Sequence, residues 1–296
     1  MNLPIGIFDS GYGGLTVMRA IVNALPQYDY VYLGDNARTP YGTRSFETVY
    51  AYTLECVRYL FDQEGCRLVV LACNTASAKA LRNIQQLDLP RLYPGESMRG
   101  VDTPTQSPDV LPTRRVLGVI RPTTEVIGAY SVTGHVGVLA TNGTVTSDSY
   151  RVEIGHLFPN IILTQEACPM WVPLIENGEH HSSGADYFVQ QHIDRILNRD
   201  PDIDTLLLAC THYPLLADKI QPLLPTGITL LSQGPIVAAS LANYLTRHPE
   251  FARKPGPVFN GKTGLRRFLT TDSAADFSRQ ASLFWGEPIQ AEKVAF

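Results

Sequence analysis

Two cysteines in the chain have matching surroundings. Cys73 lies in "LACNTAS" and Cys210 in "LACTHYP", so each thiol ends an apolar run and precedes small polar residues. In doubly wound sheets, ligands bind at the carboxyl ends of the strands. A helix that begins directly after each cysteine would offer free N–H groups to a carboxylate and lower the pKa of the thiol. The alternative is two core cysteines followed by ordinary capping residues.

Two thiols on opposite sides of one ligand predict a particular reaction. One thiol removes a proton from a carbon, and the other delivers a proton to the opposite face. Such a pair inverts a stereocentre without a cofactor, whereas a nucleophilic cysteine needs only one thiol with a base beside it. His212, two residues after Cys210, would be the proton partner of that thiol.

Two other polar segments are predicted to reach the same cleft. In "FDSGYGG", Asp9 and Ser10 follow an apolar run, where a carboxylate would assist Cys73 or bind an ammonium group. The alternative role for Asp9 is a helix N-cap. In "DNARTPYGTRS", the turn at Tyr41 and Gly42 would aim a backbone N–H or the tyrosine into the cleft, and a plain surface turn is the alternative.

The elements that position these residues follow from short apolar runs that alternate with amphipathic segments such as 46–61. Runs buried on both faces and separated by helices are typical of a parallel sheet. The segment Ile5–Gly13 aligns with Val136–Thr144 at nearly the same spacing as the two cysteines, which predicts two similar α/β units; chance is the alternative. The expected strands are "IGIF", "YVYLG", "RLVVLA", "VLGVI", "VGVLA", "TLLLA" and "ITLL".

Composition excludes several classes of protein. The 296 residues include 24 basic and 28 acidic ones without a basic run, so we expect no nucleic-acid partner. We find no signal peptide and no run near the ~20 apolar residues that cross a bilayer. The five cysteines are an odd number without CxxC spacing, and the histidines lack metal-ligand spacing. We therefore expect reduced thiols, no metal, no membrane and a cytoplasmic location.

The segment 91–115 has four prolines and no periodicity. These features predict a long surface loop between the two halves, either a tolerated insertion or a functional lid.

Five motifs, in order, resemble those of glutamate racemase, in the aspartate/glutamate racemase superfamily. The resemblance runs from Ile5 to about Leu216, and "FLTTDSAADFSRQASLFWG" continues it. It implies two pseudo-symmetric parallel-sheet α/β domains facing across a central cleft, the first formed by 1–112 and 212–296 and the second by 113–211. The motifs are "IGIFDSGYGGLTV", "YLGDNARTPYGTRS", "LACNTAS", "VPLIENGEH" and "LACTHYPLL".

The resemblance implies that the protein interconverts L- and D-glutamate without a cofactor and supplies D-glutamate for peptidoglycan. Cys73 and Cys210 would exchange protons with the substrate, assisted by Asp9 on one side and by Glu176 and His212 on the other. Thr141 and Thr144 have an alternative role as simple turn residues. The implied substrate-binding residues are Asp9, Ser10, Tyr41, Gly42, Asn74, Thr75, Thr141, Thr144, Thr211 and His212.

The chain departs from the family at the long 91–115 segment and at "VIRPTTE", residues 119–125, where "VIEPG" is common. We expect the second change to affect packing or subunit contacts rather than the reaction. A racemase for aspartate or another amino acid remains an alternative, as does a binding or thiol-redox protein, although the lack of CxxC opposes redox cycling. The oligomeric state stays open, a homodimer included.

Overall fold

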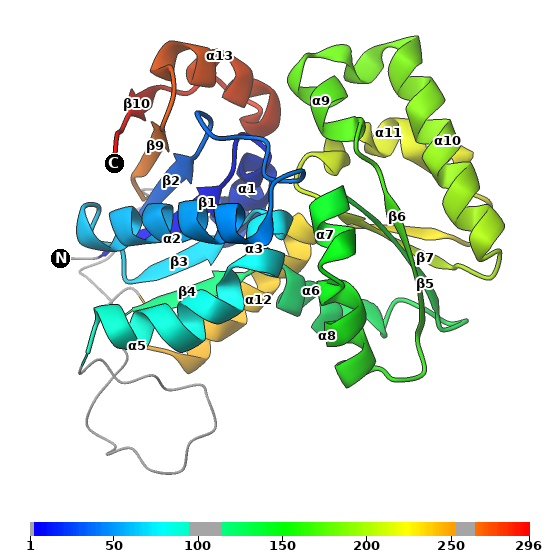
Figure 1. The fold of residues 1–296 in the computed structure, drawn as a ribbon, viewed down its shortest axis with the longest axis horizontal. Helices are drawn as coiled ribbons and strands as arrows, with labels where there is room; N and C mark the ends of the chain where they lie inside the picture. Colours follow the sequence, from blue (N-terminus) through cyan, green and yellow to red (C-terminus); the bar gives the residue numbers. More distant parts are fainter. Residues whose placement is uncertain (1–2, 95–113, 253–263) are drawn as a thin grey trace.

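The protein is built on two parallel β-sheets, which lie side by side in the computed structural model (Figure 1). The structure describes residues 3–94, 114–252 and 264–296. The first sheet has the order β10 (Ala291–Lys293), β9 (Arg266–Thr270), β2 (Tyr30–Gly34), β1 (Ile5–Asp9), β3 (Leu68–Leu71), β4 (Arg115–Gly118). The second has the order β6 (Ile162–Ala167), β5 (His135–Ala140), β7 (Thr205–Ala209), β8 (Thr229–Ser232).

The two sheets repeat one strand order. β2-β1-β3-β4 of the first sheet corresponds to β6-β5-β7-β8 of the second, with β9 and β10 added to the first. The aligned segments that begin at Ile5 and Val136 form β1 and β5, so the predicted repeat is confirmed. Cys73 follows β3 and Cys210 follows β7, which are equivalent strands. The expected fold class of two pseudo-symmetric α/β units is confirmed as well.

All seven expected strands are present, but β6, β9 and β10 were not predicted. Two of these three are edge strands, β6 in the second sheet and β10 in the first. Their sequences "ILTQEA" and "AEK" carry polar residues because an edge strand has one side without a neighbour. β9 begins with two arginines, which hides the short buried run that follows them.

Helices cover both faces of the first sheet. α2 packs with α3 and α5 on one face, whereas α1, α12 and α13 pack on the other. Burial on both faces accounts for the continuous apolar strands. These elements are α1 (Gly14–Ala24), α2 (Phe46–Asp62), α3 (Asn74–Lys79), α4 (Leu81–Asn83), η1 (Ile84–Asp88), α5 (Leu89–Leu92), α12 (Gln233–Arg247) and α13 (Ala274–Trp285).

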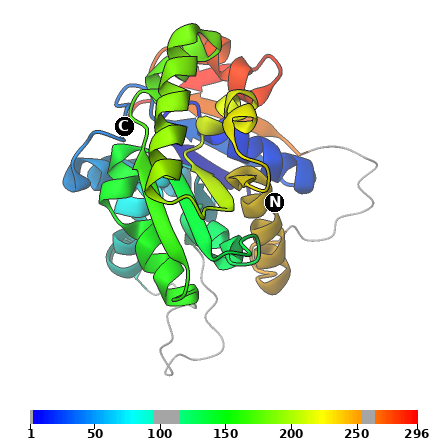
Figure 2. The ribbon, with the colours of Figure 1, turned by 90° about the vertical axis from the view of Figure 1, so that its right-hand side faces the viewer.

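The second sheet is covered in the same way. α6 and α8 pack on one face, and α9 and α10 on the other. Seen from the side of this domain, α10 crosses in front of the sheet (Figure 2). The elements are α6 (Ile120–Ile127), α7 (Asn142–Thr146), α8 (Ser149–Leu157), α9 (Trp171–Glu176), η2 (Glu179–His181), α10 (Ser183–Arg199), η3 (Tyr213–Leu216), α11 (Ala217–Ile220) and η4 (Gln221–Leu223).

The helix α2 shows how local sequence forms these elements. The hydroxyl of Ser45 accepts a hydrogen bond from Thr48 N at 3.2 Å and caps the first turn. Val49, Cys56 and Leu60 then recur at helical spacing and are fully buried. The expected helix over 46–61 and its core cysteine are both confirmed.

The sheets divide the chain differently from the expected domain boundaries. β4 pairs with β3, so residues 115–118 belong to the first sheet although they fall inside the expected second domain. β8 pairs with β7, so residues 229–232 belong to the second sheet. The chain therefore crosses between the domains after Gly118 and again after Ser232. Local apolar patterns do not reveal this, because they do not state which strand is the neighbour.

The segment 91–115 does not join the two halves as expected. Its start lies in α5 and its end in β4, and both elements belong to the first domain. Residues 95–113, which carry the rest of the loop prediction, lie outside the described residues. All five cysteines are free and buried. In the described ranges, no helix is long and apolar enough to cross a membrane.

The first prediction concerns the core. Ile7 is fully buried in β1, between β2 and β3. The variant Ile7→Ala should lose about 2–5 kcal/mol of unfolding free energy, because it removes buried methyl groups and leaves a cavity. Urea unfolding followed by circular dichroism measures this loss. The control is Val132→Ala, whose side chain is 97% exposed, and an equal stability of the two variants would contradict the assignment.

Candidate active site

The carboxyl ends of equivalent strands bring the two predicted thiols into one site. Cys73 is the N-cap of α3 and Cys210 directly follows β7, and both are almost completely buried. The Cys210 thiol contributes to raising the pKa of Cys73, so the two groups lie within electrostatic range of each other. The structure thus brings the thiols of Cys73 and Cys210 together, although these residues are 137 positions apart in the chain.

Cys73 is held as a neutral thiol. Burial, followed by the nearby charge of Asp9, raises the pKa of Cys73 to about 12. The Ser10 hydroxyl, with Oγ at 3.5 Å from Sγ, and the Ala76 N–H, at 3.4 Å, oppose this rise without cancelling it. The expectation that the helix N-terminus lowers this pKa is therefore wrong, because desolvation outweighs two hydrogen bonds. At neutral pH the thiol is in its proton-donating form.

Asp9 lies beside Cys73 and leaves one acceptor unused. Its Oδ2 accepts a hydrogen bond from Gly11 N at 2.9 Å, and its Oδ1 is buried without a hydrogen-bond partner among the described residues. Burial raises the pKa of Asp9, and the nearby His212 opposes this. α1 begins after Gly13, which is its N-cap, so Asp9 does not have the alternative role of capping that helix.

Cys210 has a different partner, the ring of His212. Nδ1 of His212 lies 3.9 Å from Cys210 Sγ, and Nε2 lies 2.9 Å from Oε1 of Glu176, the last residue of α9. Burial lowers the pKa of His212, but the hydrogen bonds to Cys210 and Glu176 raise it by more than burial lowers it. The resulting pKa is about 10. At neutral pH the ring is a cation, and Cys210, His212 and Glu176 form a hydrogen-bonded chain.

The chain after Cys210 turns more tightly than expected. Tyr213 N donates to Cys210 O at 3.1 Å and Leu215 N donates to His212 O at 3.1 Å. These bonds span three residues, so the 3₁₀ turn η3 precedes α11, in place of an α-helix that begins at once. The tight turn places the His212 ring back against the sulfur.

The glycine-rich loop after β1 meets the second domain. A Cβ at Gly13 would lie 2.3 Å from both His212 Nδ1 and Thr211 Oγ1, so a side chain there would displace the ring. Thr16 Oγ1 also donates to Thr211 O at 2.9 Å. The glycines of "GYGG" therefore permit close packing of the two domains at the site.

Three threonines from the two domains meet at α3, the helix that Cys73 caps. Thr75 Oγ1 lies 3.1 Å from Thr141 Oγ1 and 3.5 Å from Thr144 Oγ1. Thr141 also caps α7 by accepting from Thr144 N at 3.3 Å, which was its alternative role. Gly143 N donates to Gly42 O at 2.9 Å, so the predicted turn does reach the interface.

Two predicted binding side chains already have buried partners. The Tyr41 hydroxyl donates to Asp35, so it points into the first domain's core and leaves only its backbone near the site. The Asn74 amide bonds to Tyr150 and Gln233. No motif in the sequence singled out these last two residues, because their role depends on contacts between distant segments.

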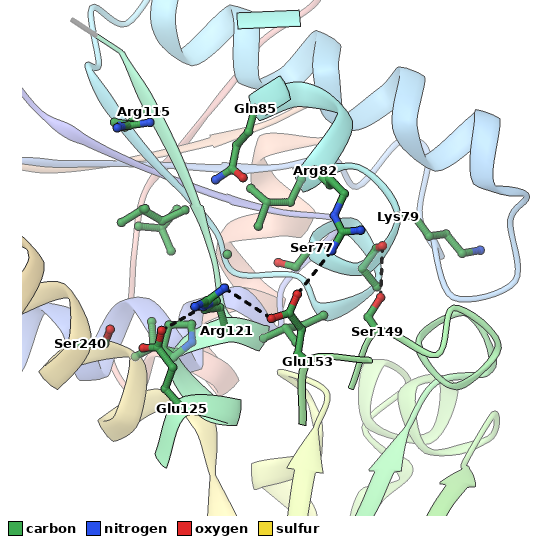
Figure 3. Close-up of a pocket in the computed structure, with 18 of the residues that line it drawn as sticks. Ser77, Lys79, Arg82, Gln85, Arg115, Arg121, Glu125, Ser149, Glu153 and Ser240 are labelled. Atoms are coloured by element: carbon green, nitrogen blue, oxygen red, sulfur yellow. Dashed lines mark hydrogen bonds and ion pairs between the residues drawn. The ribbon is translucent and has the colours of Figure 1, made fainter. Parts of the chain in front are cut away.

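A separate cavity of about 770 Å³ lies away from the thiols (Figure 3). Its walls come from α3, α4, α6, α8 and α12, and neither Cys73 nor Cys210 lines it. Glu153 forms ion pairs with Arg82 at 3.6 Å and with Arg121 at 3.7 Å, and Arg121 also pairs with Glu125 at 2.9 Å. The close-up shows these charged side chains along the cavity wall (Figure 3).

One group of metal-ligating side chains was not anticipated. Within the described ranges, ligand atoms of His135, Asp200 and Asp202 lie within 4.8 Å of one another, at the start of β5, far from its active-site end. Asp200 bonds to His135 Nδ1 at 2.8 Å and to Thr164 Oγ1 at 3.1 Å, so internal hydrogen bonds account for the group.

Comparison with known proteins agrees with this geometry, although no family model matches the chain. The chain is 38% identical to the glutamate racemase of Ruegeria sp. (strain TM1040) over 290 residues, 98% of this chain and 99% of that protein. The solved glutamate racemase isoform from Bacillus anthracis superposes with a TM-score of 0.83 at 31% identity, covering 99% and 97% of the two chains. The glutamate racemase from Francisella tularensis subsp. tularensis SCHU S4, solved in complex with D-glutamate, has a TM-score of 0.79 at 28% identity, with 99% and 98% covered.

The fold and these likenesses define the protein as a racemase, an enzyme of the isomerase class. Within that class the chain belongs to the glutamate racemase family, since the match extends over nearly its whole length.

The second prediction concerns the charge of His212. Folding raises its pKa from 6.5 to about 10, so the protonated ring stabilises the fold fully below about pH 6.5, and this stabilisation is lost as the pH rises through 10. In Glu176→Gln the pKa of His212 should fall, because the carboxylate that bonds to Nε2 loses its charge. Histidine NMR titration measures the shift. Glu125→Gln, which changes a carboxylate outside the site, serves as the control, and an unchanged pKa in Glu176→Gln would contradict this role.

Proposed function

We propose that the protein interconverts L-glutamate and D-glutamate by direct proton transfer at Cα between Cys73 and Cys210. The observation that supports this most strongly is the placement of two buried thiols, each following an equivalent strand, within electrostatic range of each other. Relatives at 33–38% identity over nearly the whole chain carry the name glutamate racemase.

The charged groups of an amino acid find complementary partners in the site. The unpaired, buried Oδ1 of Asp9 accepts a hydrogen bond from the α-ammonium group of the substrate, and Ser10 adds a second polar contact beside Cys73. The backbone N–H groups at the start of α3, from Asn74 and Thr75, bind a carboxylate. The hydroxyls of Thr141 and Thr144, with the Gly42 turn, close this side of the site.

The reaction needs one thiolate and one thiol. One sulfur takes the Cα proton, the electron pair stays on the substrate as a carbanion, and the opposite thiol donates its proton to the other face. The product has the inverted configuration, and the roles of the two sulfurs are exchanged. No group other than these thiols gains or loses a proton permanently.

The two thiols enter this cycle from different surroundings. Cys73 begins as the proton donor, since burial and Asp9 raise its pKa to about 12. Beside Cys210, the cationic ring of His212 lies 3.9 Å from the sulfur and would balance a negative charge that develops there. Glu176 holds that ring in place through Nε2. The two thiols thus have unlike partners, a carboxylate and a hydroxyl beside Cys73 and a cation beside Cys210.

Aspartate is the second candidate substrate, because its charged groups would meet the same partners. The threonine side of the site favours the longer side chain of glutamate only by the discrimination that one methylene allows, about 1–3 kcal/mol. Relative turnover of the two amino acids distinguishes the candidates. We further propose that the D-glutamate formed supplies peptidoglycan synthesis, an inference that rests on the family resemblance.

The third prediction tests the two-thiol mechanism. Purified protein incubated with L-glutamate in D₂O, without pyridoxal phosphate or metal, should incorporate deuterium at Cα as optical rotation is lost. Cys73→Ser and Cys210→Ser should each lose more than about 10²-fold in racemisation rate, since each removes one proton-transfer group. Cys66→Ala, at a buried thiol in the first domain's core, should racemise normally. Normal racemisation by either serine variant would contradict the two-thiol mechanism.

A further inference from the structure

A closed ring of three hydrogen bonds adjoins Cys73. Asn74 Nδ2 donates to Gln233 Oε1 at 2.6 Å, Gln233 Nε2 donates to Tyr150 Oη at 2.8 Å, and Tyr150 Oη donates to Asn74 Oδ1 at 2.7 Å. All three side chains are buried. Each group donates once and accepts once around the ring, so the bonds agree on a single direction and strengthen one another.

The ring joins parts of the chain that belong to different domains. Asn74 is the first residue of α3 in the first domain, and Tyr150 lies in α8 of the second. Gln233 is the first residue of α12, at the point where the chain leaves the second sheet after β8. Three elements that are distant in sequence thus meet at the residue next to Cys73.

Gln233 also holds the other crossing between the domains. The second hydrogen of its Nε2 is shared between Val119 O at 3.2 Å and Thr123 Oγ1 at 3.1 Å. Val119 lies between β4 and α6, where the chain leaves the first sheet. One buried amide therefore bonds to both connections between the domains and to the start of the Cys73 helix.

We propose that Gln233 and Tyr150 are positioning residues that fix the thiol of Cys73 relative to the second domain. They act through Asn74 and do not touch the reacting atoms. The inference rests on the proposed function, because it assigns the ring to the Cys73 half of the two-thiol reaction. Cys210 has its own partners, His212 and Glu176, and receives no bond from the ring.

This role has a physical reason. Cys73 caps α3, so its sulfur moves with the first turn of that helix. Asn74 begins the turn, and its amide is held from the second domain and from both connections at once. A displacement of about 1 Å between reacting groups costs about 10²-fold in rate, so a small rotation of the domains would separate Cys73 from a substrate that is held by both. The ring prevents that rotation.

The variants Tyr150→Phe and Gln233→Leu remove different members of the ring. Each should lower kcat/KM for racemisation by about tenfold or more. Because the ring acts as a unit, the kcat/KM of the double variant should lie within about twofold of that of the less active single variant. Tyr30→Phe is the matched control: its buried hydroxyl donates to Leu25 O at 2.8 Å, far from the site, and this variant should racemise normally.

An irreversible half-reaction identifies which thiol is affected. With the β-chloroglutamate isomers that differ at Cα, one thiolate removes the Cα proton, the electron pair forms the Cα–Cβ bond and chloride leaves. Water then hydrolyses the enamine to 2-oxoglutarate and ammonium, which are measured. The isomer that Cys210→Ser still converts reports on Cys73, and the isomer that Cys73→Ser still converts reports on Cys210.

Tyr150→Phe and Gln233→Leu should slow the Cys73 elimination by about tenfold or more and change the Cys210 elimination by less than about twofold. Equal loss of both eliminations would indicate a general loss of structure and overturn the proposal, as would normal racemisation. If the two serine variants behave as expected and the ring variants do not, only the ring proposal falls. If each serine variant retains both eliminations, the two-thiol function falls, and the ring proposal with it.

Discussion

Burial of the ionisable groups is the constraint on which the site depends. Burial raises the pKa of both Asp9 and Cys73, so a charge is costly on that side unless a substrate group balances it. On the other side, burial alone would favour the neutral form of His212. Two hydrogen bonds outweigh the effect of burial and keep the ring protonated. The site thus carries a proton on one thiol and a cation beside the other before any ligand is present. A pair of symmetric sheets therefore holds an asymmetric distribution of charge.

The interface between the domains serves this charge distribution. Gly13 allows the loop after β1 to approach His212, which brings the cation within range of Asp9. The Thr75 and Thr141 contact joins the domains on the other flank. The ring of Asn74, Tyr150 and Gln233 closes the interface at its base. The contacts that pack the two domains together thus also position the groups that surround the thiols.

The sequence predicts most of the framework because its signals are local. The seven apolar runs and the helix after Ser45 need only their own residues to be recognised, and the repeated "LAC" shows where two strands end. The features that the sequence did not predict depend on contacts with residues far away in the chain. Membership of β4 and β8 in a sheet, the pKa of Cys73 and the role of Gln233 follow from partners far along the chain. Edge strands such as β10 were missed because half of their surroundings is solvent.

The order of strands in the first sheet has a consequence for synthesis of the chain. β2 pairs with β1 on one side and with β9 on the other, and β9 begins at Arg266, long after β2 in the sequence. Until that segment leaves the ribosome, β2 is an open edge of apolar residues with unpaired N–H and C=O groups. Such an edge favours pairing with other chains. Residues 266–270 therefore seal this edge of the first domain, and a chain that lacked them would expose an aggregating edge rather than form a smaller enzyme.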